Sequence, residues 1–349
     1  MSGVQMLTLG PDAQDQRLDR WFRKTWPHLR QGQIEKMCRK GEIRLDGGRV
    51  KSATRLSEGA VLRVPPLPAP DTDVPRAKPK PRISDADAEM IRACVIYRDD
   101  DIIALNKPAG LAVQGGSGQT RHVDGLAPAL AFELEDGPKL VHRLDKDTSG
   151  VLVLARNGRA AAGLARAFQS RRTRKIYWAA VASVPAPKAG TIRFGLVKAA
   201  GHGPNGAGEK MICIHPDDVD RTPGAKRAVS DYMVLDAAGK RTSWVALSPI
   251  TGRTHQLRAH MAEIGTPIVG DGKYGGNSQT NEGDGWGAQL GGDISRKLHL
   301  HARSLTFEHP VTGARLHLTA PLPDHMARTW ETFAWDPREI AEDPFEDLE

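Results

Sequence analysis

The chain has 349 residues and a mass of 37.9 kDa, with 39% apolar and 26% charged residues, and a typical domain size of ~150 residues predicts about two folded domains. The mean hydropathy is -0.44 and no apolar run approaches the ~18 residues of a membrane-spanning helix, which excludes a helical membrane protein. The formal charge of +7 permits a polyanionic partner without requiring one.

The start of the chain and its cysteines indicate a compartment. The first twenty residues are acidic in places and lack a basic start followed by an apolar core, so we expect no targeting peptide and a cytoplasmic protein. The cysteines are few, odd in number and far apart: Cys38, Cys94 and Cys213. We therefore expect reduced thiols rather than disulfides or a cysteine metal site.

Residues 1–65 form a basic N-terminal region, with 13 Lys and Arg against 7 Asp and Glu. Apolar residues recur at helical spacing in RLDRWFRKT and again around Ile34 to Cys38, and the second run stops at Gly41, which predicts two short helices. The segment EIRLDGGRV then predicts a hairpin that turns at Asp46-Gly47-Gly48, and GAVLRVP predicts a closing strand.

The polar face of these two predicted helices is basic. It would display Arg20, Arg23, Lys24, Arg30, Arg39 and Lys40. The order of elements, with R-L-D-R-W near its start and G-x-I-x-L-x-G-x-x-V across the turn, resembles the S4 RNA-binding domain. That resemblance implies that the basic face grips structured RNA through phosphates, which set position and affinity without reading bases. From charge alone, a solvated helix face is the alternative.

Two segments of unusual composition bound the second basic region. Residues 66–90 are predicted to be a linker, because the stretch from Pro65 to Pro81 has seven prolines in seventeen residues and favours an extended chain. Residues 336–349 hold seven acids and one Arg, without periodicity, and we expect a flexible acidic tail. A catalytic domain is predicted between them, over residues 91–335.

A polar turn leads into an apolar strand in the segment HRLDKDTSGVLVLAR at 142–156. From chemistry alone, Asp145 in this turn could be a nucleophile, a general acid or base, a metal ligand, or a turn-forming residue without chemistry. For a lone Asp the last of these is the commonest case. The residues by themselves leave all four open.

This segment matches H-R-L-D-x-x-T-S-G-x-(L/V)-(L/V)-x-A and resembles the signature of the RluA family of pseudouridine synthases. Further stretches typical of the family follow in its order: LNKPAGLAVQGGSG at 105–118, RKIYWAAV at 174–181, ITGRTHQLRAHMAEIGTPIVGDGKYG at 250–275 and LHLHARSLTFEHP at 298–310. The Q-G-G-S-G sequence makes the chain look most like the RluC type. The resemblance implies conversion of uridine to pseudouridine within RNA, with no cofactor and no metal.

The resemblance also implies roles for individual residues. Asp145 matches the essential carboxylate, either as a nucleophile or as the base that removes the 2′ proton, and Arg258 matches its basic partner. An ionised Asp in a dry pocket needs such a cation, and we expect a bidentate contact between the two. Tyr177 matches the family's active-site tyrosine, and Leu257 is expected to pack under the base. Without the resemblance, Arg258 would be a surface cation and Tyr177 a structural strand residue.

Other residues are expected at the edge of the same site. Arg143 matches an arginine that enters the RNA where the base has flipped out, against the alternative of a structural salt bridge. Asn106 and Lys107 are expected to border the cleft, and the glycines after them lack the spacing of a triphosphate-binding loop. Four histidines lack acidic or cysteine partners at ligand spacing, which favours RNA contact or core hydrogen bonds over a metal: His255, His260, His299 and His301.

The predicted fold class is α+β. The resemblance implies a mixed, largely antiparallel sheet in the catalytic domain, and the pattern of residues 159–172 predicts an amphipathic helix between two strands. The expected partner is RNA, namely 23S ribosomal RNA of the large subunit. We expect the protein to be a monomer and to have no membrane partner. Transfer RNA is the alternative substrate. A non-catalytic S4-type RNA-binding or assembly factor is the alternative class, although the chain retains Asp145, Tyr177 and Arg258.

Overall fold

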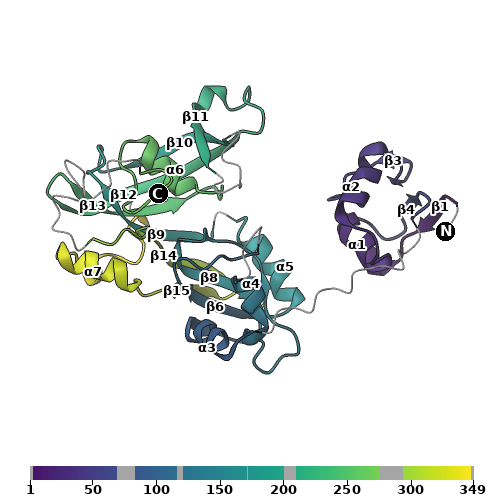
Figure 1. The fold of residues 1–349 in the computed structure, drawn as a ribbon, viewed down its shortest axis with the longest axis horizontal. Helices are drawn as coiled ribbons and strands as arrows, with labels where there is room; N and C mark the ends of the chain where they lie inside the picture. The colour runs from purple at the N-terminus through teal and green to yellow at the C-terminus, as the bar shows by residue number, and fades with distance from the viewer. Residues whose placement is uncertain are drawn as a thin grey trace. The chain divides into compact units, whose positions relative to one another are not determined.

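The computed structural model describes residues 3–68, 83–115, 121–170, 172–199, 210–275 and 294–346. The chain divides into two compact units, Met1–Arg82 and Ile83–Glu349 (Figure 1). In these described ranges, no helix is long and apolar enough to cross a membrane. Most of the proline-rich segment lies outside the described residues.

Unit 1 packs two short helices against a small antiparallel sheet. Its elements are β1 (Gln5–Thr8), η1 (Pro11–Ala13), α1 (Leu18–Thr25), α2 (Gln31–Lys40), β2 (Arg44–Leu45), β3 (Gly48–Arg49) and β4 (Val61–Val64), with sheet order β1-β4-β2-β3. Leu18, Phe22 and Ile34 are fully buried between the layers. The two predicted helices, the hairpin and the closing strand are confirmed, and Gly41 ends α2 with a φ of 71°.

Unit 2 is built on one 11-stranded sheet. Its strands are β5 (Val95–Arg98), β6 (Ile102–Lys107), β7 (Lys139–Leu140), β8 (Ser149–Ala155), β9 (Arg174–Ala182), β10 (Ala189–Lys198), β11 (Met211–Ile214), β12 (Lys226–Ala238), β13 (Thr242–Pro249), β14 (Leu300–Glu308) and β15 (Arg315–Thr319). The main path is β11-β10-β12-β13-β9-β14-β8-β6-β5, with β15 on β14 and β7 on β8. The β14 and β8 pair is parallel and the other described pairs are antiparallel. The α+β prediction is confirmed.

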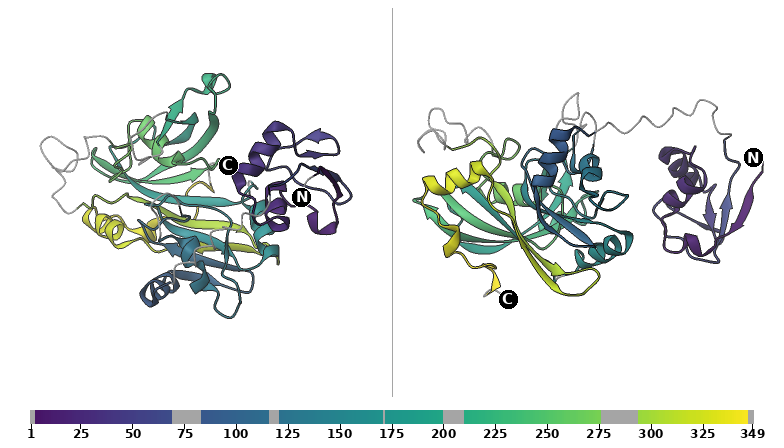
Figure 2. Two further views of the ribbon diagram at one scale, coloured as in Figure 1. Left: turned by 45° about the vertical axis from the view of Figure 1, so that its right-hand side comes forward. Right: turned by 90° about the horizontal axis from the view of Figure 1, so that it is seen from below.

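Helices cover the two halves of this sheet separately. They are α3 (Asp85–Ala93), α4 (Val123–Leu126), α5 (Gly158–Ala167), α6 (Gln256–Glu263) and α7 (Asp324–Thr332), with short turns η2 (Ala127–Leu130), η3 (Pro216–Asp218) and η6 (Pro337–Glu339). Figures 1 and 2 show α6 beside β10 and β12, whereas α3, α4 and α5 surround β6 and β8. The predicted helix at 159–172 is confirmed in α5, which ends at Ala167.

A glycine allows the two halves to meet. Gly150 at the start of β8 has a φ of 109°, and a Cβ there would lie 2.2 Å from the carbonyl oxygen of Ala302 on β14. Because only glycine permits this approach, the parallel contact of β8 with β14 requires Gly150. The polar turn before β8 is thereby held at the middle of the sheet.

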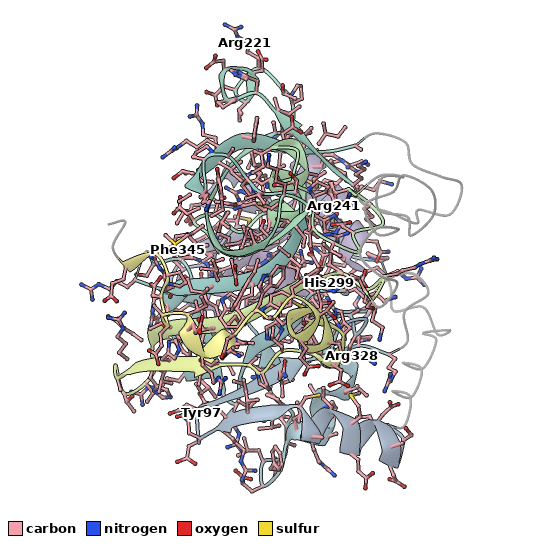
Figure 3. The ribbon with its side chains drawn as sticks, turned by 90° about the vertical axis from the view of Figure 1, so that its left-hand side faces the viewer. Tyr97, Arg221, Arg241, His299, Arg328 and Phe345 are labelled. Atoms are coloured by element: carbon pink, nitrogen blue, oxygen red, sulfur yellow. The ribbon has the colours of Figure 1, made fainter. Side chains whose placement is uncertain are left out.

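Two segments predicted to be extended or flexible are partly folded. Ser84 Oγ accepts a hydrogen bond from the Asp87 N–H at 3.2 Å and starts α3, so the linker ends before residue 84 and not at 90. The prediction of a flexible end is wrong for residues 336–346. Phe345, which is labelled in Figure 3, is 2% exposed and belongs to a cluster rich in aromatic side chains. Asp343 Oδ2 pairs with Arg174 Nε at 2.7 Å. The buried ring and the ion pair together dock the segment.

Candidate active site

A pocket of about 660 Å³ opens in unit 2 between the turn before β8 and the segment that leads into α6. Strands β9 and β14 contribute its floor. Five of the sequence-predicted residues, far apart in the chain, line this one pocket: Arg143, Asp145, Tyr177, Leu257 and Arg258. Asn106 and Lys107 are not among its lining residues.

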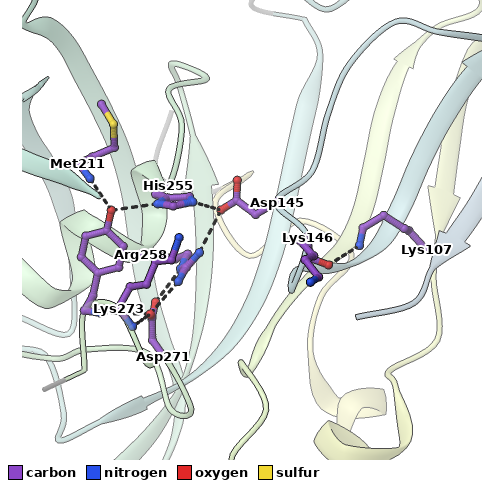
Figure 4. A network of polar contacts seen from close by, with 9 residues as sticks. Lys107, Asp145, Lys146, Met211, His255, Arg258, Asp271 and Lys273 are labelled. Atoms are coloured by element: carbon purple, nitrogen blue, oxygen red, sulfur yellow. Dashed lines mark hydrogen bonds and ion pairs between the residues drawn. The ribbon is translucent and has the colours of Figure 1, made fainter. Parts of the chain in front are cut away.

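Asp145 lies at the wall of the pocket with its side chain 26% exposed. Its backbone carbonyl accepts a hydrogen bond from the Thr148 N–H at 3.2 Å, which closes the turn. One carboxylate oxygen, Oδ2, faces two groups from the α6 segment: Arg258 Nη1 at 3.7 Å and His255 Nε2 at 4.0 Å (Figure 4). The carboxylate is thus partly screened from water and faces a cation.

The expected bidentate contact between Arg258 and Asp145 is wrong. Arg258, buried on α6, makes its bidentate contact with Asp271, through Nε to Oδ2 at 2.7 Å and Nη2 to Oδ1 at 2.8 Å. Burial is the largest single effect and acts to lower the pKa of Arg258, but the hydrogen bonds and charge of Asp271, together with the charge of Asp145, exceed it, so the pKa is raised. The fork is held by a second carboxylate, so only the remaining nitrogen, Nη1, is directed at Asp145.

Asp271 was missed by the sequence reasoning. Its side chain is fully buried, and its Oδ1 also accepts hydrogen bonds from the backbone N–H groups of Lys273 and Tyr274 at 3.0 and 3.2 Å. Gly270 before it has a φ of 73°, and a Cβ there would lie 2.0 Å from the Lys297 carbonyl oxygen. The sequence did contain a signal, an Asp between two glycines after an apolar run. The carboxylate of such an Asp can accept hydrogen bonds from the backbone N–H groups of the turn that follows it.

Tyr177 and Leu257 both contribute to the apolar part of the pocket wall. Tyr177 on β9 lies opposite Leu247 of β13 and Ala302 of β14, and it contacts the cores of both halves of the sheet. Burial, and then the negative charge of Asp145, raise the pKa of Tyr177, so the hydroxyl stays protonated. Leu257, on the first turn of α6, is 6% exposed. Both place apolar surface in the pocket that holds the Asp145 carboxylate.

Lys107 lies beneath the turn that carries Asp145 and is fully buried. Its ammonium donates hydrogen bonds to the carbonyl oxygens of Pro108, Leu111 and Lys146, at 2.9, 2.8 and 2.9 Å. Burial lowers the pKa of Lys107 to about 7, against smaller opposing effects of nearby carboxylates. Because Lys146 follows Asp145, this lysine fixes the turn that carries the carboxylate. Asn106 is similarly occupied, donating to the Pro321 carbonyl at 3.2 Å.

Arg143 is exposed at the edge of the pocket and forms no ion pair within the described residues, so a structural salt bridge is not seen there. Three of the four histidines make hydrogen bonds in the core: His260 with Ser230, His299 with Thr329 and His301 with Ser149. The fourth, His255, lies beside Asp145, where sequence reasoning had not placed it.

Comparison with known proteins assigns the family. A family model described as RNA pseudouridylate synthase matches residues 101–263, which include the turn, β9 and α6. Ribosomal large subunit pseudouridine synthase C of Vibrio cholerae is 32% identical over 327 residues, covering 93% of this chain and 95% of that protein. The chain belongs to the RluA family of pseudouridine synthases. The synthase therefore converts uridine to pseudouridine in RNA.

Two further relatives of the synthase extend the comparison. RNA pseudouridine synthase 4, mitochondrial, of Arabidopsis thaliana is 33% identical over 374 residues and covers 88% of this chain and 77% of that protein. The solved structure of human RNA pseudouridylate synthase domain containing 4 is 28% identical, with a TM-score of 0.55, and covers 71% of this chain and 95% of that one. Both agree with the family assignment and with the fold of unit 2.

Proposed function

We propose that this synthase modifies uridines of large-subunit ribosomal RNA and that Asp145 is its catalytic carboxylate. The observation that carries the assignment is the position of Asp145, in a pocket with an apolar wall and opposite a buried, fixed guanidinium. The ribosomal substrate is supported by the relatives named ribosomal large subunit pseudouridine synthase C, which align with more than nine-tenths of the chain.

The reaction sets the demands on Asp145. The N1–C1′ bond of uridine breaks, the uracil turns, a C5–C1′ bond forms, N1 gains a proton and C5 loses one. Asp145 can act as a nucleophile toward the ribose or base, or it can remove the 2′ proton to give a glycal. Both routes require the ionised carboxylate, and Arg258 Nη1 at 3.7 Å favours that form. No other group is needed in the proposal, and no cofactor or metal takes part.

The other pocket residues are proposed to hold the flipped uridine. Tyr177 stacks on the uracil, which is worth roughly 1–3 kcal/mol per base, and Leu257 packs against it. A uridine in a stem must leave the base stack to reach Asp145. Arg143, an exposed planar cation at the pocket edge, is proposed to occupy the space that the base leaves in the RNA.

Unit 1 is proposed to dock the RNA as an S4-type domain. The six basic residues predicted for its helices are all exposed: Arg20, Arg23, Lys24, Arg30, Arg39 and Lys40. Two of them form ion pairs, Lys24 with Asp12 at 4.0 Å and Lys40 with Glu42 at 3.6 Å. Exposed pairs of this kind contribute about 0–1 kcal/mol, so phosphates can displace them. We further propose a cytoplasmic, monomeric enzyme.

Mapping of pseudouridine tests the substrate. Unmodified large-subunit ribosomal RNA and transfer RNA would each be incubated with the wild type or with Asp145→Asn, treated with carbodiimide and copied by primer extension. We expect stops in ribosomal RNA with the wild type only. Stops confined to transfer RNA would overturn the ribosomal substrate, and equal stops with Asp145→Asn would overturn the role of the carboxylate. If the wild type gives no stops in ribosomal RNA and none in transfer RNA, the proposed substrate and its alternative are both contradicted.

A further inference from the structure

A row of polar contacts connects strand β11 with Asp145. The Met211 N–H donates to the hydroxyl oxygen of Tyr274 at 2.9 Å, and that oxygen lies 3.1 Å from Nδ1 of His255. The opposite ring nitrogen, Nε2, faces Asp145 Oδ2 at 4.0 Å. Figure 4 shows the row passing from Met211 to His255 and on to Asp145. His255 is therefore the link between a backbone anchor and the carboxylate.

The imidazole of His255 is held firmly at this place. The residue directly precedes α6 and has a φ of 52°, a left-handed conformation that costs a side chain such as His roughly 1–2 kcal/mol. Its side chain is 10% exposed, and its ring meets that of Tyr274 edge to face, with centroids 5.8 Å apart. The ring of Tyr274 is in turn covered by the guanidinium of Arg258 at 5.3 Å.

These contacts favour one tautomer of His255. The Tyr274 oxygen already accepts the Met211 N–H, so its own hydrogen is available to Nδ1. The proton of a neutral imidazole then resides on Nε2 and points at the carboxylate. Burial lowers the pKa of His255, which keeps the ring neutral near pH 7. The charged groups that face it are Asp145, Arg258, Lys273 and Asp271.

We propose that His255 is a positioning residue for Asp145, in which the Nε2–H, set by Tyr274, binds Oδ2 of the carboxylate when RNA fills the pocket. Both described contacts to the carboxylate fall on Oδ2, from His255 and from Arg258 Nη1, so Oδ1 is left for the substrate. The 4.0 Å separation shortens on binding, as catalytic hydrogen bonds often do when substrate arrives. This inference rests on the proposed catalytic role of Asp145.

Three variants separate this role from a structural one. His255→Gln places an amide N–H near the position of Nε2 but does not titrate, whereas His255→Asn tolerates the left-handed backbone and is too short to reach Asp145. Tyr274→Phe removes the group that sets the tautomer. The measurement is the single-turnover rate at saturating RNA from pH ~5.5 to ~8.5, with RNA affinity and thermal midpoint recorded for each variant.

We expect His255→Asn to lose about 10²-fold in rate, with unchanged RNA affinity and thermal midpoint, because a carboxylate displaced by about 1 Å is poorly placed for either role of Asp145. His255→Gln restores most of that loss. The rate of His255→Gln also falls less at acidic pH than that of the wild type. In the wild type, a protonated His255 would bind the carboxylate more strongly and make it less reactive. Tyr274→Phe slows the reaction when His255 is present. Added to the His255→Gln variant, the same substitution has no further effect on the rate.

Two results would overturn the proposal. One is a wild-type rate for His255→Asn. The other is an equal loss of rate in the Asn and Gln variants, with the same decrease in rate at acidic pH as in the wild type. Asp145→Asn is measured alongside. If that variant turns over normally, the proposed function itself fails. If it is inactive while His255→Asn is normal, only the role of His255 fails.

Discussion

The basic helical face of unit 1 and the two buried cations of unit 2 differ in how their side chains are held. In unit 1 the six cations of the helical face are exposed, and the ion pairs described for them are long and solvated. In unit 2, Arg258 and Lys107 are buried, and each is fixed by short hydrogen bonds to carboxylate or carbonyl oxygens. Exposed charges suit phosphates in any nearby position, whereas buried charges define one position only.

The difference sets what each substitution should do. Loss of an exposed cation removes one attraction that salt already weakens, so effects are small and additive. Loss of a partner from a buried pair leaves a charge without solvent or counterion, so effects are large and depend on neighbours. The following predictions test that contrast, beginning with the largest effect.

Asp271→Ala should destabilise unit 2 by about 3–5 kcal/mol and abolish turnover, because it leaves the Arg258 guanidinium buried without its bidentate partner. Urea denaturation and single-turnover kinetics measure the two effects. Asp343→Ala is the matched control, since Asp343 also binds an arginine side chain through two nitrogens but at a partly exposed position. Comparable losses of stability and of turnover in both variants would contradict the difference that we draw between the buried pair and the partly exposed pair.

Lys107 predicts a pH dependence of stability. Its pKa falls from 10.5 in the unfolded chain to about 7 in the folded one, so the unfolded state binds more protons between these values. The free energy of unfolding of the wild type should therefore rise with pH from about 7 to 10.5, relative to Lys107→Met, by an amount on the order of a few kcal/mol. Parallel pH profiles of the two proteins in urea denaturation would show that the buried ammonium has an ordinary pKa.

Tyr177→Leu should lower kcat/KM by roughly 10 to 100-fold, since a lost stacking contact is worth about 1–3 kcal/mol. The change keeps an apolar side chain on β9, so the thermal midpoint reports separately on packing against Leu247 and Ala302. Tyr177→Phe keeps the ring and tests the hydroxyl alone. If Leu and Phe behave alike, the ring does not stack on the base.

Removal of exposed cations from unit 1 should have the smallest effect per residue. Each of Arg20→Gln, Arg23→Gln and Arg39→Gln is expected to weaken RNA binding by less than about 1 kcal/mol and to reduce the salt slope by up to about 0.9. Lys240→Gln, at an exposed turn of unit 2, is the control. Filter binding over a salt series measures both quantities. If the variant that combines all three substitutions has the salt slope of the wild type, unit 1 does not contact the RNA through this face.

The sequence predicted what depends on local pattern. The helices around Trp21 and Met37, the turn at Asp46-Gly47 and the buried strand after Ser149 follow from spacing and glycine placement, and all are present. The five residues that line the pocket were identified through a resemblance, because nothing in their own surroundings marks them as neighbours.

What the sequence missed depends on three-dimensional direction. No spacing shows that Arg258 directs its guanidinium toward Asp271, or that Lys107 lies inward beneath the turn that carries Asp145. Nor does composition reveal that Phe345 is buried or that Asp343 in the same acidic segment pairs with Arg174. These outcomes depend on the sheet that brings distant segments together.

The most direct test of the central claim is release of tritium from RNA labelled at C5 of uridine, since C5 loses its hydrogen when the C5–C1′ bond forms. Wild type and Asp145→Asn would be compared at RNA concentrations that saturate both, with binding measured in the same samples. The account predicts release by the wild type and none by Asp145→Asn, at equal RNA affinity. Release by Asp145→Asn at the wild-type rate would contradict it.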